Sequence, residues 1–243
     1  MGTRNIFASI DVKGILDKYK VDIINFYGFD PTQRWEGLTP EQQARLRGLN
    51  LNDYNRSNPK SICRIGYDNY TAVSDYTRLV SCKDSTIGWK LRDQDIKTVS
   101  GERYLTTTYN LAIRAKNRDT IRWWGHTINP GEQTQAVLSD VDQPGSSTEK
   151  PPEFTQYVRK SVSFLNPAAP IDPTGVNLSK GIEINSRSTF CIQCILESAP
   201  KTISYDVVLL LLTTPFMDTD DTNKYMALPI VKVVTDPTIV IEA

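Results

Sequence analysis

The feature that most constrains the fold is an alternation of two sets of side chains with a period of two. It is clearest from Tyr104 to Ala115. One set there is Leu105, Thr107, Tyr109, Leu111, Ile113 and Ala115, and the other is Tyr104, Thr106, Thr108, Asn110, Ala112 and Arg114. Successive side chains of a strand point to opposite faces, so this pattern predicts a half-buried β-strand. Its β-branched and aromatic residues suit a pleated surface.

Similar alternation recurs along the chain, whereas helical periodicity is scarce. We predict further strands at Ile6–Val12, Thr120–Gly125, Gln133–Val141, Ser188–Glu197, Tyr225–Val234 and Thr238–Ile241. The segment Phe154–Leu165 also has apolar residues four apart, which suits a helix, but its Thr, Val and Ser content favours a strand. Because proline cannot donate to a ladder, Pro229 predicts an edge or a bulge in its strand.

The segment Tyr205–Thr214 differs from the other strands because it is apolar on both alternating faces. A strand of this kind is covered on both sides. A second sheet is one expected cover, and a helix, a loop or another subunit is the other. We therefore name a candidate interface with a second copy, formed by Val207, Val208, Leu209, Leu210, Leu211 and Leu212.

Two short helices are predicted early in the chain. Val12–Tyr19 follows Asp11, a candidate N-cap, and Pro40–Arg47 follows Thr39 with the spacing of a capping box. Many strands, turn-rich connections and few helices together predict an all-β fold, an antiparallel β-sandwich with jelly-roll or Greek-key-like connections. We expect one domain over residues 1–243, with an insertion at about 28–75.

The balance of charge limits the partners. The chain has 28 Lys and Arg against 28 Asp and Glu, so its net charge is zero. Zero net charge removes the electrostatic attraction that drives most nucleic-acid binding. It also removes repulsion between copies, which favours self-association. The longest strictly apolar run has six residues and no apolar leader follows the start, so we expect no membrane span and a cytoplasmic location.

The residues that could carry catalysis are few. His126 is the one histidine, and the sequence has no nucleophile elbow and no phosphate-binding glycine motif. Cys191 and Cys194 form a CxxC, but alternation places them on opposite faces of a strand, as buried small residues rather than a redox pair. We therefore expect no enzyme activity and no cofactor. A hydrolase built from distant carboxylates is the remaining enzymatic alternative.

Ligand-binding candidates come from aromatic and acidic residues. Trp123 and Trp124 point to opposite faces of their strand, so one is expected in the core while the other, with His126, could stack on a glycan. A weak calcium candidate is the acidic run that contains Asp218, Asp220 and Asp221. That run lacks the glycine and glutamate of an EF-hand, and a solvated hairpin tip explains it equally well.

Several short motifs occur in one order along the chain. They are Asn5–Asp11, Arg118–Trp123, a proline-rich stretch after the third strand, and Thr235–Val240. This order resembles the bacterial inclusion-body protein family, the PixA/AidA-like proteins. The resemblance implies a β-sandwich without an established enzymatic activity, associated with intracellular crystalline inclusions and quorum-regulated expression in host-associated bacteria. The segment 28–75 and the four Cys depart from that pattern, and a content of only three Met does not support a role as a methionine store.

Two functional hypotheses follow. The first is a non-enzymatic β-sandwich that associates with itself as a homodimer or a higher assembly, with cytoplasmic inclusions as one expected location. The second is a carbohydrate-binding, lectin-like module that uses an exposed tryptophan and loop carboxylates.

Overall fold

The structure is a computed structural model. It describes residues 1–65, 76–82, 85–90, 96–99, 102–105, 110–127, 134–146, 148–167, 184–217 and 224–242. The helices are α1 (Val12–Tyr27), α2 (Pro40–Arg47) and the 3-10 turn η1 (Trp35–Gly37). The strands are β1 (Thr3–Ile10), β2 (Cys63–Ile65), β3 (Thr77–Ser81), β4 (Thr86–Lys90), β5 (Ile96–Val99), β6 (Glu102–Leu105), β7 (Asn110–Lys116), β8 (Thr120–Thr127), β9 (Ala136–Asp142), β10 (Phe154–Pro167), β11 (Ile184–Leu196), β12 (Lys201–Ser204), β13 (Asp206–Leu212), β14 (Phe216–Met217), β15 (Tyr225–Met226), β16 (Pro229–Thr235) and β17 (Thr238–Glu242).

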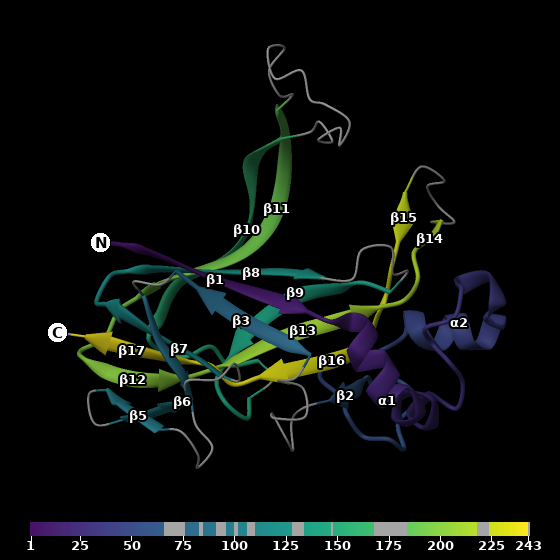
Figure 1. The fold of residues 1–243 in the computed structure, drawn as a ribbon. Helices are drawn as coiled ribbons and strands as arrows, with labels where there is room; N and C mark the ends of the chain where they lie inside the picture. The colour runs from purple at the N-terminus through teal and green to yellow at the C-terminus, as the bar shows by residue number, and fades with distance from the viewer. Residues whose placement is uncertain are drawn as a thin grey trace, which may run out of the picture.

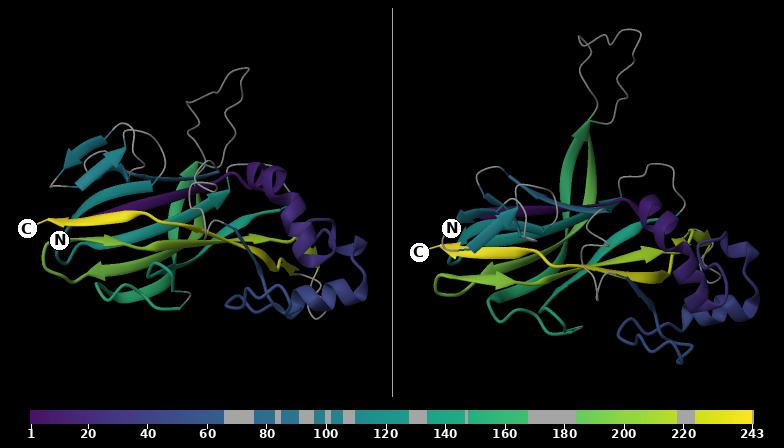
Figure 2. Two further views of the ribbon diagram at one scale, coloured as in Figure 1. Left: turned by 90° about the horizontal axis from the view of Figure 1, so that it is seen from below. Right: turned by 60° about the horizontal axis from the view of Figure 1, so that its bottom comes forward.

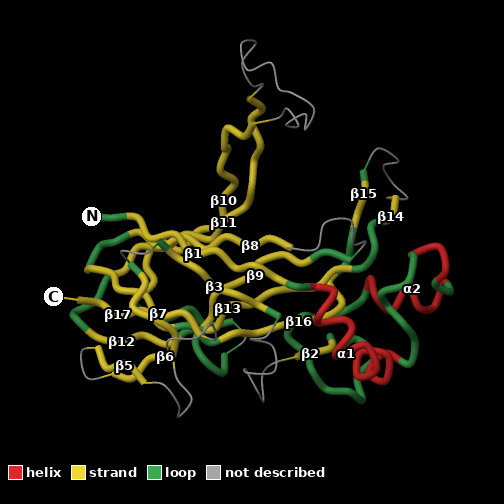
Figure 3. The backbone as a smooth tube through the Cα atoms, in the orientation of Figure 1, coloured by secondary structure: helices red, strands yellow, loops and turns green. Residues whose placement is uncertain are grey.

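The described strands form three larger sheets and one small hairpin. Their strand orders are β10-β11-β8-β1-β3, β12-β17-β7-β4-β6-β5 and β2-β16-β13-β9, and β14 pairs with β15. The sheets make up the body of the molecule, while α1 and α2 lie at one end (Figures 1 and 3). The outer part of the β10–β11 hairpin rises away from the body, which two further views confirm (Figure 2).

The expectation of a mostly β fold is confirmed, but the expectation that its sheets are antiparallel is wrong. Three neighbouring pairs run parallel, namely β1 with β8, β2 with β16 and β7 with β17. Parallel neighbours cannot be joined by a tight hairpin, and the strands of each of these pairs are far apart in the sequence. Jelly-roll or Greek-key connectivity stays a prediction.

The segment with the clearest alternation is not one strand. Glu102–Leu105 and Asn110–Lys116 form β6 and β7, and residues 106–109 lie outside the described part. Both strands pair with β4, on its two opposite sides. Alternation correctly predicted the strand character of each piece. Alternation does not reveal that a third strand, β4, lies between β6 and β7 in the sheet.

Most other predicted strands are confirmed within a few residues, but the predicted strand Tyr225–Val234 is divided into β15 and β16, which belong to different sheets. The segment that also suited a helix is the strand β10, and it pairs along its length with β11. Pro229 lies at a register shift in the β13–β16 pair, where Leu211 pairs with Val231 but Leu212 pairs with Pro229. The predicted irregularity at this proline is therefore confirmed.

Helix α2 has its predicted bounds, and both hydrogen bonds of the Thr39–Gln42 capping box are present. Helix α1 begins as predicted after Asp11, whose carboxylate accepts from the Gly14 N–H. It continues to Tyr27 rather than Tyr19 and ends at Gly28, which adopts the left-handed conformation with φ 75°. No helix in the described part has the length and apolar character needed to cross a membrane.

The doubly apolar strand β13 is covered by the chain itself. Val207, Leu209 and Leu211 face the main hydrophobic cluster and are fully buried. Val208 and Leu210, on the opposite face, are also buried, with 2% and 7% of their surface exposed. The prediction that both faces are covered is confirmed. The candidate interface at Val207–Leu212 is corrected, because a strand buried within one chain offers no free surface to a second copy.

The predicted insertion contributes to the same core as the rest of the chain. Its strand β2 pairs in parallel with β16. Trp35 stacks on Phe216, with ring centroids 3.9 Å apart. Leu38, Leu46 and Ile65 belong to the same buried cluster as the central strands. The assignment of one domain to the whole chain stays a prediction.

Candidate interaction face

The two adjacent tryptophans of β8 point to opposite faces, as predicted, but Trp123 is a core residue. Its side chain is 1% exposed. Its indole N–H donates to the Tyr205 hydroxyl at 3.2 Å, and the Phe154 ring lies 5.2 Å from its own. Trp123 is therefore removed from the candidate ligand-binding residues, because its ring and its polar atom are both engaged inside the molecule.

Trp124 faces outward from the sheet, but it is covered as well, with 6% of its surface exposed. The Phe7 ring of β1 stacks on it at 6.3 Å with an interplanar angle of 17°. Its indole N–H donates to Asn5 Oδ1 at 3.0 Å. Cross-strand neighbours thus occupy the ring face and the polar atom that a sugar would use.

The other candidates cannot be placed beside Trp124. The backbone of His126 lies in β8, two residues further along, but its side chain lies outside the described residues. Asp218, Asp220 and Asp221 also lie outside them. In the part of the chain that the structure describes, no group of three or more His, Cys, Asp or Glu residues is arranged to hold a metal ion.

The outward face of the β10-β11-β8-β1-β3 sheet has a feature that none of these candidates includes. One residue from each strand lies in the same register position, and we call this set the apolar row. Its members are Val80, Phe7, Trp124, Cys191 and the stem of Lys160. Phe7 is 40% exposed and Val80 37%. Val158, in the adjacent register position of β10, is 43% exposed.

Polar side chains flank the apolar row on both sides. Asn5, Arg122 and Gln193 lie in the register position on one side, where the Arg122 Nε donates to Gln193 Oε1 at 2.8 Å. Ser9 and Arg78 are paired on the other side. Phe7, Val80 and the neighbouring Val158 are thus exposed apolar side chains around a buried Trp124 and Cys191. Exposed apolar side chains with a polar margin are the usual composition of a protein-binding face.

The cysteine of the apolar row does not add reactivity to this face. Cys191 is fully buried, and burial raises the pKa of its thiol. Cys194 points to the other face, where burial again raises the thiol pKa. Both are free thiols, and a protonated, buried thiol is a poor nucleophile. They act as small apolar side chains, which agrees with the sequence interpretation.

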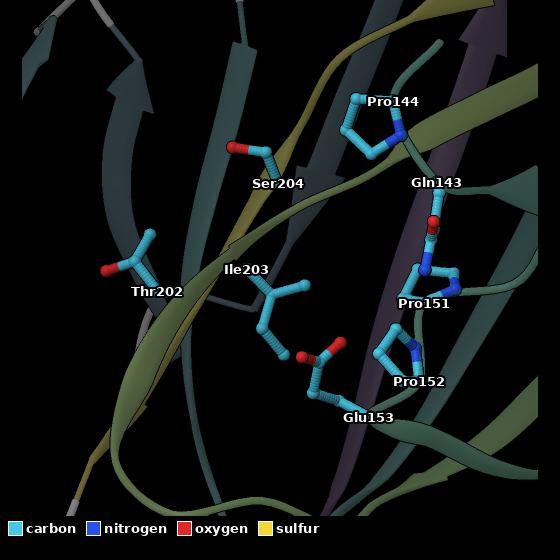
Figure 4. Close-up of a pocket in the computed structure, with 8 residues that line it drawn as sticks. All are labelled: Gln143, Pro144, Pro151, Pro152, Glu153, Thr202, Ile203 and Ser204. Atoms are coloured by element: carbon cyan, nitrogen blue, oxygen red, sulfur yellow. The ribbon is translucent and has the colours of Figure 1, made fainter. Parts of the chain in front are cut away.

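A separate open pocket of about 270 Å³ lies between the β9–β10 loop and β12 (Figure 4). Its lining consists of Gln143, Pro144, Pro151, Pro152, Glu153, Thr202, Ile203 and Ser204. Among the described residues of this lining, Glu153 is the one carboxylate, and it forms an ion pair with Lys201. Hydrolysis of a glycoside needs two facing carboxylates, so this lining does not supply the pair.

The exposed members of the face were missed from the sequence. The signal was present in β1, where Ile6, Ala8 and Ile10 alternate with Asn5, Phe7 and Ser9. A phenylalanine on the otherwise polar side of a half-buried strand indicates an apolar position on the surface. Its alignment with Val80 and Trp124 depends on pairings between distant segments, which alternation does not specify.

Comparisons with known proteins give a structural likeness but no sequence match. No protein-family model matches the chain, and no curated protein matches it. Among solved structures, the chain is similar to an inclusion body protein (PixA) from Burkholderia cenocepacia, with a TM-score of 0.46 and 12% identity. The match covers 100% of this chain and 97% of that chain. That protein bears the family name of the sequence resemblance, but a likeness at this TM-score does not establish family or function.

Proposed function

We propose that the chain is a non-enzymatic protein that associates with itself, and that the apolar row is the centre of the contact. The observation that carries the proposal is the exposure of Phe7, Val80 and Val158 on one sheet face. Burying such side chains against a second copy removes apolar surface from water, which is the main driving force of association. The same face on both copies would give an isologous dimer.

The size of the face suits a second copy of the chain. Five strands about 4.8 Å apart and about as long as β1 and β8 span roughly 24 by 26 Å, or about 600 Å². A stable interface buries about 800 Å² on each partner, so this face would supply most of that area. The net charge of zero adds no long-range repulsion between copies.

The test is a concentration series by sedimentation velocity or light scattering. We expect the wild type to associate, and Phe7→Lys to weaken the dissociation constant about ten-fold or more, because a central apolar contact is replaced by facing charges. Val137→Lys is the matched control, because Val137 is also 40% exposed but lies on β9, in another sheet. A monomeric wild type, or equal effects of the two substitutions, would contradict the proposal.

The lectin alternative has lost its main support. The tryptophan side chains that the structure describes, those of Trp35, Trp123 and Trp124, are all buried. A glycan array probed with the wild-type protein remains its direct test, and no binding is expected. A location in the cytoplasm, in inclusions, belongs to the self-association proposal, and microscopy of the expressed protein tests it.

A further inference from the structure

Three aspartates stand in one row across neighbouring strands, on the outward face of the β2-β16-β13-β9 sheet. Asp142 of β9 is the direct partner of Asp206 of β13. Val207 pairs with Thr235 of β16, so the next residue, Asp236, continues the row on the other side of Asp206. Like charges placed directly opposite each other destabilise a sheet. We call Asp142, Asp206 and Asp236 the aspartate row.

The two paired aspartates are buried and unequally stabilised. Each is 1% exposed. Asp142 Oδ1 accepts from the Lys150 ammonium at 2.5 Å, whereas Asp206 Oδ2 accepts, among the residues that the structure describes, only from the Gly145 N–H at 3.3 Å. Asp142 Oδ2 and Asp206 Oδ1 have no hydrogen-bond partner in the described part of the chain. Asp206 is thus the carboxylate whose charge is least compensated.

The cations packed around the row are mostly engaged elsewhere. Lys150, from the β9–β10 loop, also forms an ion pair with Asp140 at 2.9 Å. Lys232 of β16 donates to the Tyr54 hydroxyl at 2.9 Å. The guanidinium of Arg64, from β2, lies 4.3 Å from the centre of the Tyr54 ring. The charged groups that face Asp206 from these elements therefore offset its negative charge only in part.

The balance of these interactions favours a proton on Asp206. Burial is the largest cause and raises the pKa, and the Gly145 N–H lowers it. The charge of Asp236 raises it, the charge of Arg64 lowers it and the charge of Asp142 raises it, so the pKa lies at about 7 rather than near 4. Asp206 is therefore the member of the row that changes charge near neutral pH.

Asp206 also holds a loop. Gly145 belongs to a tight turn in which the Ser146 N–H donates to the Gln143 carbonyl at 3.0 Å, and Gly145 has a φ of 78°. The same loop carries Lys150, the partner of Asp142. Its residues Gln143 and Pro144 also form one wall of the open pocket (Figure 4). A change in the charge of Asp206 therefore affects a turn that forms part of the pocket wall.

We propose that Asp206 and the Gln143–Ser146 turn form a proton-operated latch. With a proton on Asp206, Asp142 is the charged member of the pair and Lys150 neutralises it, so the turn stays closed on β13. When Asp206 releases its proton to solvent, two buried carboxylates face each other. The Gly145 N–H favours the charged form of Asp206, but the burial of the charge is the larger effect, so the turn moves away from β13 and water reaches Asp206.

The test follows the turn directly by NMR and hydrogen exchange, with a chelator present to exclude an effect of divalent cations. We expect the Gly145 amide resonance of the wild type to titrate with a midpoint near neutral pH. We also expect the protection of the Gly145 and Ser146 amides to fall about ten-fold, relative to Asp206→Asn, between about pH 6 and about pH 8. Asparagine keeps the size and an acceptor oxygen, so the variant should show neither change.

Three results would overturn the latch. They are a midpoint in the ordinary aspartate range, protection that does not change with pH, or the same titration in Asp206→Asn. A second variant keeps the proposal testable if Asp206→Asn does not fold. Asp142→Asn removes the opposing charge, so its Gly145 midpoint should move to lower pH, and an unchanged midpoint would count against the latch.

Discussion

At the scale of single residues, Asp119 shows how one buried carboxylate joins distant parts of the backbone. It accepts hydrogen bonds from the Gly2 N–H at 2.5 Å, the Lys116 N–H at 3.1 Å and the Arg4 Nε at 3.1 Å. Burial raises its pKa, but these hydrogen bonds and the charge of Arg4 lower it further, and the net shift is downward. The start of β1 is thereby fixed to the turn before β8.

We expect Asp119→Ala to lower the free energy of unfolding by about 1–3 kcal/mol, because it leaves buried donors without an acceptor. Asp17→Ala is the control, because the ion pair of Asp17 with Lys13 is exposed and its loss should cost no more than about 0.5 kcal/mol. Urea denaturation measures both values. A similar cost for the two variants would show that Asp119 contributes no more than a surface charge.

At the scale of elements, most local signals were interpreted correctly from the sequence, the end of α1 excepted, and non-local ones were not. Helix α2 was predicted completely, because Thr39, Pro40 and Gln42 act within one turn. The segment Tyr104–Ala115 was misread as one strand, because β4 separates its two ends in the sheet. The face around Trp124 was missed for the same reason, since Phe7 reaches it through the pairing of β1 with β8.

The close approach of β8 to β9 gives a prediction at this scale. A Cβ atom on Gly125 would lie 2.8 Å from the Leu138 Cβ and 3.1 Å from its backbone nitrogen. We expect Gly125→Ala to cost about 1–3 kcal/mol of stability, because neither strand can move without disturbing its sheet. Gly48→Ala is the control, since its Cβ would meet only ordinary contacts from 3.5 Å. Equal thermal midpoints for the two variants would contradict this packing.

At the scale of the whole molecule, apolar side chains are divided between a core that one chain completes and a face that it leaves open. The strand β13 looked like the natural contact with a second copy, yet the chain covers both of its sides. Composition and periodicity indicate that a strand needs cover but do not identify the cover. The exposed face contains fewer apolar residues and is recognisable only once five strands are aligned.

The aspartates should also shape the stability of the whole molecule against pH. The pKa of Asp119 and that of Asp140 are lowered, because hydrogen bonds and cations outweigh burial. Their contribution to the free energy of unfolding is therefore present above the unfolded pKa of about 4 and is lost in acid. Burial raises the pKa of Asp142 and that of Asp206, the latter to about 7. Their contribution to stability is therefore present below the unfolded pKa and is lost as the pH rises through the folded pKa. Stability should therefore be greatest in weak acid and fall as the pH rises to about 7.

Asp206→Asn separates these two contributions. The variant keeps the acid-sensitive aspartates and removes the group that must lose a proton near neutral pH. We expect it to be more stable than the wild type by a few kcal/mol at about pH 8, since each pKa unit corresponds to about 1.4 kcal/mol, and to differ much less at about pH 4. Urea denaturation at a series of pH values measures the difference. A difference that does not grow with pH would mean that folding does not raise the pKa of Asp206.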